Sequence, residues 1–161
     1  MVQPGKFNIM KNIVLLLLLT LKGGLFLYGQ NIIPNDSQRK AITSLIDQYS
    51  EAREKRDTVL LKTILTMDVD QLVSTGEWRN GIGASLEGML KSSTNSPGTR
   101  TLNIEKIRML NPESAIIDCR YVIKNEDGST RKMWSTFIVL SDNEAWKICA
   151  IRNMLPATEG H

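Results

Sequence analysis

Residues 114–140 read SAIIDCRYVIKNEDGSTRKMWSTFIVL, and this stretch decides the fold class. Apolar and polar residues alternate on both sides of Asp127-Gly128, which is the spacing of strands whose two faces differ. An Asp-Gly dipeptide between two alternating runs is a strong signal for a β-hairpin. The stretch therefore predicts two antiparallel strands, Ser114–Ile123 and Arg131–Leu140.

The alternation extends to one more strand on each side of this hairpin. Thr101–Leu110 precedes it and is separated from it by Asn111-Pro112. Ala145–Asn153 follows it after the polar turn Ser141-Asp142-Asn143. The second half of the chain is therefore predicted to be a four-stranded antiparallel meander.

The first half of the chain has helical periodicity instead. Apolar residues recur every three or four positions over Gln38–Lys55, and Asp57 is a capping residue for a second, shorter helix at about 58–65. A short hairpin is expected around Thr75-Gly76, and a third helix at Ala84–Lys91. This order predicts an α+β fold in which N-terminal helices pack on the concave face of a curved antiparallel sheet.

The register of the hairpin predicts which side chains share a face. A two-residue turn at Asp127-Gly128 pairs Tyr121 with Trp134, and the next turn pairs Trp134 with Arg152. Tyr121, Trp134 and Ile148 are then expected beneath the helices. The opposite face is still apolar, so we expect two copies of the chain to form a homodimer through the sheet.

The two cysteines are expected to be free thiols. In this register Cys119 and Cys149 lie on opposite faces and two strands apart. Neighbouring strands are about 4.8 Å apart, so the two Cα atoms lie near or beyond the limit for a disulfide.

Residues 1–30 have the pattern of a secretory signal peptide, with lysines before a short apolar run and Gly29 near the end. Met10 is an equally good start for this leader. An uncleaved membrane anchor is disfavoured by Lys22, since a lysine at the centre of a membrane helix costs about 2.5–3.5 kcal/mol. We therefore expect a secreted or periplasmic protein that does not associate with membranes after cleavage. A linker is expected at 31–37, one domain at 38–156 and a disordered tail at 157–161.

Charge and composition exclude several classes of function. The leader holds three lysines and no acid, so the chain's 20 basic and 17 acidic residues leave 17 of each in the mature part, and no basic surface for nucleic acid is expected. The only histidine is His161, which excludes Ser-His-Asp and Cys-His catalysis and His-rich metal sites from the core. The sequence holds no phosphate-binding glycine loop and no dinucleotide motif, so no cofactor or metal is expected.

Three segments, in order, are similar to one known family. Residues 41–65, AITSLIDQYSEAREKRDTVLLKTIL, resemble the two opening helices of SnoaL-like domains, with Tyr49 midway and Asp57 before the second helix. Residues 66–90, TMDVDQLVSTGEWRNGIGASLEGML, resemble the segment that follows, and residues 145–156, AWKICAIRNMLP, resemble the closing strand of the SgcJ/EcaC-type branch. The chain thus resembles the nuclear transport factor 2-like superfamily over residues 38–156.

The resemblance implies a cone-shaped fold with a pocket between sheet and helices, in proteins that are often dimeric. The superfamily includes isomerases, cyclases, dehydratases and non-catalytic binding or assembly modules, so membership does not fix the function.

The candidate ligand-binding residues are mainly aromatic. Aromatic side chains could line the pocket, Arg152 could stack on Trp134 and present a charge, and Asn153 could form hydrogen bonds near the mouth. The full set of candidates is Tyr49, Trp78, Tyr121, Trp134, Arg152 and Asn153.

The acids near the strands are not nominated as catalytic residues. Asp68 and Asp70 fit a turn or cap, and Asp118 fits an ion pair with Arg120 on the same face. The catalytic residues are therefore unknown, and the sequence does not decide whether the protein is an enzyme.

Three functions stay open at this point. The first is an exported module that binds a small, largely apolar molecule in the cone. The second is an isomerase or lyase that uses a buried carboxylate, and the third is a non-catalytic homodimeric assembly module. The absence of an inward-facing acid in the expected register favours the first over the second.

Overall fold

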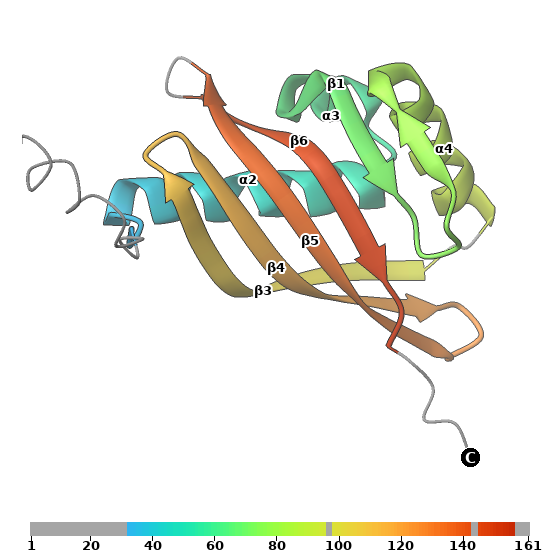
Figure 1. Ribbon diagram of the computed structural model, residues 1–161. Helices are drawn as coiled ribbons and strands as arrows, with labels where there is room; N and C mark the ends of the chain where they lie inside the picture. Colours follow the sequence, from blue (N-terminus) through green and yellow to red (C-terminus); the bar gives the residue numbers. More distant parts are fainter. Residues whose placement is uncertain (1–31, 96–97, 143–144, 157–161) are drawn as a thin grey trace, which may run out of the picture. The chain divides into compact units, whose positions relative to one another are not determined.

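The first half of the described chain contains the helices and a short hairpin, and the second half contains only strands (Figure 1). The computed structural model describes residues 32–95, 98–142 and 145–156, so the predicted leader and tail lie outside the described residues. None of the helices in these ranges is long and apolar enough to cross a membrane. The elements in chain order are α2 (Asp36–Lys55), α3 (Thr58–Ile64), β1 (Leu65–Leu72), β2 (Trp78–Asn80), α4 (Gly81–Asn95), β3 (Gly98–Asn111), β4 (Ser114–Asn125), β5 (Thr130–Asp142) and β6 (Ala145–Met154).

The expected antiparallel meander is confirmed, and it forms two thirds of a larger sheet. The strand order is β2-β1-β6-β5-β4-β3, and β3 to β6 pair antiparallel in sequence order. The predicted short hairpin is also present as β1 and β2. The sheet is mixed, however, because β1 begins directly after α3 and pairs parallel with β6. Leu65, which was expected to be helical, is the first residue of β1.

Capping residues fix the ends of the first two helices. Asn35 and Gln38 form a reciprocal capping box at the start of α2. The Asp57 carboxylate accepts hydrogen bonds from the backbone N–H groups of Val59 and Leu60, both at 2.9 Å, which confirms the predicted cap of α3. Helix α2 lies across the concave face of the sheet in Figure 1. It buries a stripe of side chains there, namely Ile42, Leu45, Ile46, Tyr49, Ala52 and Arg53.

The predicted register of the β4–β5 hairpin is wrong by one residue. Asn125 pairs with Ser129, and the turn has three residues, of which Gly128 has a φ of 83°. A three-residue turn that ends in a left-handed glycine is a common alternative to the two-residue turn at Asp-Gly. Tyr121 therefore pairs with Met133 instead of Trp134.

This shift moves every β5 side chain to the opposite face, because side chains alternate along a strand. Phe137 is fully buried beneath α2, where its ring contacts Tyr49 edge to face with the centroids 5.2 Å apart. Trp134, which was expected in the core, lies on the outer face instead. Tyr121 and Ile148 remain on the inner face, as predicted.

The pairing of β6 with β5 also differs from the prediction. A bulge between Ile138 and Val139 shifts the register, so Arg152 pairs with Thr136 and lies on the outer face. Homodimer formation through that face stays a prediction.

Both cysteines are free, as predicted. Cys119 on β4 and Cys149 on β6 are separated by strand β5. Burial raises the pKa of the Cys119 thiol to about 12, so this thiol is protonated and unreactive at neutral pH.

Candidate functional site

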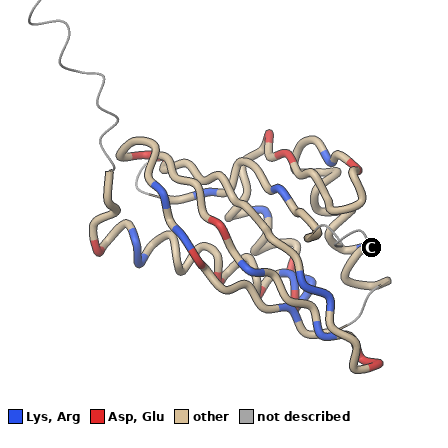
Figure 2. Tube along the Cα trace, turned by 60° about the horizontal axis from the view of Figure 1, so that its bottom comes forward, with Lys and Arg blue, Asp and Glu red and all other residues tan. Residues whose placement is uncertain are grey.

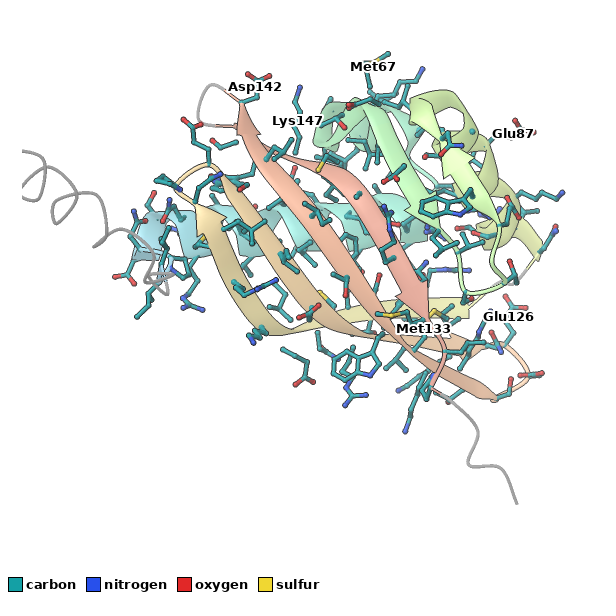
Figure 3. All side chains as sticks on the ribbon, in the orientation of Figure 1. Met67, Glu87, Glu126, Met133, Asp142 and Lys147 are labelled. Atoms are coloured by element: carbon teal, nitrogen blue, oxygen red, sulfur yellow. The ribbon has the colours of Figure 1, made fainter. Side chains whose placement is uncertain are left out.

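A cavity of about 280 Å³ opens between the helices and one end of the sheet. Figure 3 shows Met133, which lines it, at the end of the sheet opposite Asp142 and Lys147. Side chains from α2, α4, the β1–β2 hairpin and strands β3 to β6 form the wall. They are Arg53, Gln71, Val73, Ser74, Thr75, Glu77, Arg79, Gly88, Lys91, Ser92, Asn95, Arg100, Tyr121, Ile123, Arg131, Met133 and Asn153.

The wall of this cavity is strongly basic. Among the described residues that line it, five are cations and one is a carboxylate, Glu77. Glu77 is already paired, because its Oε1 lies 3.1 Å from Nε of Arg79. Figure 2 shows Lys and Arg segments close to the β4–β5 hairpin, at this end of the sheet. Residues 31–161 hold 17 basic and 17 acidic residues, so the positive charge of the cavity is local.

Arg53 is the most unusual of these cations. It is only 6% exposed and lies one helical turn after Tyr49 on the buried stripe of α2. Its Nη1 donates to the Tyr49 hydroxyl at 3.1 Å and its Nη2 to the Ser92 hydroxyl at 2.8 Å. Nε is buried with no hydrogen-bond partner among the described residues.

Both side chains that hold Arg53 are neutral. Burial raises the pKa of the Tyr49 phenol above its usual value, so Tyr49 is protonated at neutral pH. Burial alone would lower the pKa of Arg53, but the hydrogen bond to Tyr49 and the attraction of the Tyr49 and Tyr121 phenols, once these ionise at high pH, give a net upward shift. The guanidinium is therefore a buried positive charge that no described carboxylate neutralises, an arrangement that is costly in free energy.

Neutral polar groups complete the wall and are held by hydrogen bonds. Gln71, 1% exposed, accepts from Nη1 of Arg79 at 3.4 Å. Nη2 of Arg131 donates to the Ser74 hydroxyl at 2.7 Å, and the Ser135 hydroxyl donates to Oδ1 of Asn153 at 2.6 Å. Several polar side chains around the cavity therefore have fixed orientations.

The structure brings three of the six predicted site residues to this cavity. Tyr121 and Asn153 line it, and Tyr49 lies directly behind Arg53. Whether they bind a ligand stays a prediction.

The other three predicted site residues do not line the cavity. Trp134 stacks on Arg120 of the neighbouring strand, 3.4 Å from the guanidinium carbon to the ring centroid. Arg152 forms an ion pair with Asp70 at 2.9 Å and lies 4.7 Å from the centroid of the Trp78 ring. The predicted contact between Arg152 and Trp134 is therefore wrong, because the β5–β6 register pairs Trp134 with Met154 and Arg152 with Thr136.

The acids near the strands are also away from the cavity. Asp118 accepts a hydrogen bond from the Thr136 hydroxyl at 2.7 Å, so the expected ion pair with Arg120 is wrong. Arg120 lies nearer to Glu105, at 3.8 Å. Within the described ranges, no three His, Cys, Asp or Glu side chains gather in a way that could hold a metal ion.

Sequence reasoning missed the cations of the cavity, although one signal was present. The apolar spacing of α2 continues through Tyr49 and Ala52 to Arg53, which puts a cation at a position expected to be buried. Long charged side chains are almost never fully buried unless they are paired. The other cations, Arg79, Lys91, Arg100 and Arg131, come from separate elements that only the fold brings together.

No protein-family model and no curated protein matches the chain. The comparison with known proteins therefore rests on solved structures. An NTF2-like protein of unknown function from Shewanella oneidensis is 22% identical, with a TM-score of 0.63 over 72% of this chain and 98% of that one. An NTF2-like superfamily protein from Salmonella enterica is 19% identical, with a TM-score of 0.62 over 75% and 92% of the two chains. A cystatin-like domain of unknown function from Nostoc punctiforme is 15% identical, with a TM-score of 0.69 over 78% and 82%.

None of these three structures is described as a member of the SgcJ/EcaC-type branch, so the similarity to that branch stays a resemblance. The three matches agree with the curved sheet and the packed helices of this chain. The chain therefore has the nuclear transport factor 2-like fold, also described as cystatin-like.

Proposed function

We propose that this protein is a binding module that takes a small, negatively charged molecule into the cavity. The observation that carries the proposal is the wall itself: its described residues include five cations and one carboxylate, Glu77, which is paired with one of the five, Arg79. A buried or half-buried cation gains most from a partner of opposite charge in a site that excludes water. The expected ligand thus changes from a largely apolar molecule to one that carries an acidic group.

The size of the cavity limits the ligand. Its volume of about 280 Å³ lies at the lower end of the range for small-molecule pockets, roughly 300–1,000 Å³. The lining also includes buried, mainly apolar side chains, namely Tyr121, Ile123 and Met133. A compact molecule with one apolar part and one acidic part fits this combination. With the predicted leader, the protein would meet such a ligand outside the cytoplasm.

The same wall supports binding more than catalysis by a buried carboxylate. Such a reaction needs an acid inside the cavity whose pKa is raised by burial. Glu77 is the one acid that the described wall contains, and its side chain is 60% exposed and paired with Arg79. We therefore propose a binding function in preference to an isomerase or lyase.

Reversing the charge of Arg131, an exposed cation of the cavity wall, tests this proposal. Calorimetric titration of the purified protein with sodium benzoate, succinate and inorganic phosphate is expected to give a Kd at or below about 1 mM for at least one of them. Arg131→Glu should weaken that binding by about tenfold, because Arg131 lines the cavity. Lys132→Glu is the matched control, since Lys132 is the next residue, makes the same charge change and points to the other face. Equal effects of the two variants, or no binding of any anion, would contradict the proposal.

Gly88 on α4 allows a test that leaves the charges unchanged. A Cβ added at Gly88 would overlap Nε of Arg79, so Gly88→Ala must displace the Arg79 side chain. Replacing an interior helix glycine with alanine favours the helix by about 0.8–1.0 kcal/mol, so urea denaturation should show little or no loss of stability. Calorimetry should show weaker anion binding than in the unchanged protein. Unaltered binding would mean that Arg79 takes no part in it.

A further inference from the structure

We propose that Arg53 is the anchor of this cavity and that the group it binds is a carboxylate. This inference rests on the proposed function and adds the chemical class of the ligand and the residue that selects it.

The first observation is the number of donors that Arg53 has left. A guanidinium carries five N–H donors in one plane. The described contacts use one on Nη1, to Tyr49, and one on Nη2, to Ser92. Among the described residues Nε–H has no partner. Each Nη carries two N–H groups and uses one of them in these contacts. Nε and the adjacent Nη form the edge of the guanidinium that matches the two oxygens of a carboxylate.

The second observation is that Arg53 is held rigidly before any ligand arrives. The side chain is 6% exposed, and its two partners come from different helices, Tyr49 from α2 and Ser92 from α4. The Tyr49 ring is itself fixed against Phe137 of the sheet. The Ser92 hydroxyl donates to the Met89 carbonyl at 3.0 Å, which leaves its lone pairs for Arg53. A guanidinium fixed in this way loses little conformational entropy when it binds.

The third observation is the missing negative charge. Removing a cation from water is unfavourable unless an anion and further hydrogen bonds compensate it. Tyr49 and Ser92 supply hydrogen bonds but no charge. A ligand carboxylate would supply both the charge and an acceptor for Nε.

The wall next to Arg53 favours a carboxylate over a phosphate. Tyr121 and Met133 are at most 6% exposed and present mainly apolar surface to the same cavity. A carboxylate on a short aliphatic or aromatic body would place its charge at Arg53 and its body against these two side chains. A free phosphate is charged on every side and would leave that surface without a partner. The exposed cations Lys91 and Arg131 are open to solvent and would suit either anion.

The experiment compares three probes on the purified protein by calorimetry: sodium benzoate, its neutral isostere benzamide, and inorganic phosphate. We expect benzoate to bind at least about tenfold more tightly than benzamide and phosphate, because hydrogen bonds to charged groups are the strong ones. Arg53→Met should lower benzoate affinity between about tenfold and a hundredfold. Arg53→Lys keeps the charge but loses the planar edge, so it should restore only part of the affinity.

A direct readout follows the unchanged protein and uses the Arg53→Lys variant only to assign one signal. The Nε–H signal of Arg53 in a nitrogen–proton NMR spectrum is identified by its absence in Arg53→Lys. It should shift downfield when benzoate is added and stay in place when benzamide is added. A structural arginine away from the ligand would show no such selective shift.

Each outcome separates this inference from the proposed function. If anions bind and the Arg53 variants bind them unchanged, the anchor is overturned while the proposed function stands on the cations at the mouth. If phosphate binds in preference to benzoate and depends on Arg53, the carboxylate class is overturned. If none of the anions binds the unchanged protein, the proposed function itself is wrong.

Discussion

Replacing Phe137 with alanine is expected to lower the free energy of unfolding by about 3–5 kcal/mol, as removal of a buried aromatic ring usually does. Phe137 is fully buried at the centre of the inner face, and its ring contacts Tyr49 of α2. Its loss leaves a cavity between the sheet and the helix that covers it. Urea denaturation followed by circular dichroism measures the change.

Trp134→Ala is the matched control on the same strand. Trp134 is half-buried on the outer face, where its main contact is the stacked guanidinium of Arg120. An exposed contact of that kind is worth about 0.5–1 kcal/mol, so the control should change stability far less than Phe137→Ala. If Trp134→Ala were the more harmful of the two, the register with a two-residue turn at Asp127-Gly128 would be correct and the observed one wrong.

Ile117→Asp is expected to have a still larger effect and to leave the protein mostly unfolded. Ile117 is fully buried and lies between Ile107 of β3 and Phe137 of β5. A carboxylate there would be surrounded by apolar groups with no cation beside it. The expected loss is more than about 5 kcal/mol, which is as large as the whole stability of many domains, roughly 5–15 kcal/mol. Circular dichroism at 25 °C and the soluble yield would show it.

Ile116→Asp is the control for that substitution, one residue away on the opposite face. Ile116 is half-buried and lies beside Arg108 of β3 and Ile138 of β5. A carboxylate at this position would gain a neighbouring cation in reach of solvent, so the variant should fold. Similar losses at the two positions would mean that both faces of β4 are buried.

The meander and the helix caps could be predicted because their signals are local. The alternation around Asp127-Gly128 and the cap at Asp57 depend on neighbours within a few residues, and the structure confirms both. The faces of β5 could not be predicted, since Asp127-Gly128 fits a two-residue turn or a three-residue turn with Gly128 left-handed. The choice between the two depends on which face of β5 packs under α2, and Phe137 is a better core residue than Trp134.

The parallel pairing of β1 with β6 also could not be predicted from neighbouring residues in the sequence. Residues 65–72 contain Asp68, Asp70 and Gln71, which obscure the alternation of a strand. Gln71 is nevertheless 1% exposed, because it lies on the inner face beside Ile151. The basic cavity has the same origin: its cations come from α2, α4, the β1–β2 hairpin, β3 and β5, and only the tertiary fold places them around one space.

The central position of β6 has a consequence for biosynthesis. This strand is the last in chain order, yet it lies between β1 and β5 and joins the helical half of the chain to the meander. Until β6 has left the ribosome, Ile148 and Ile151 are missing from the interior, and the strand that pairs with both β1 and β5 is missing from the sheet. Pairings of such high contact order form slowly. The helical half and the meander can therefore join into one sheet only after β6 itself has been synthesised.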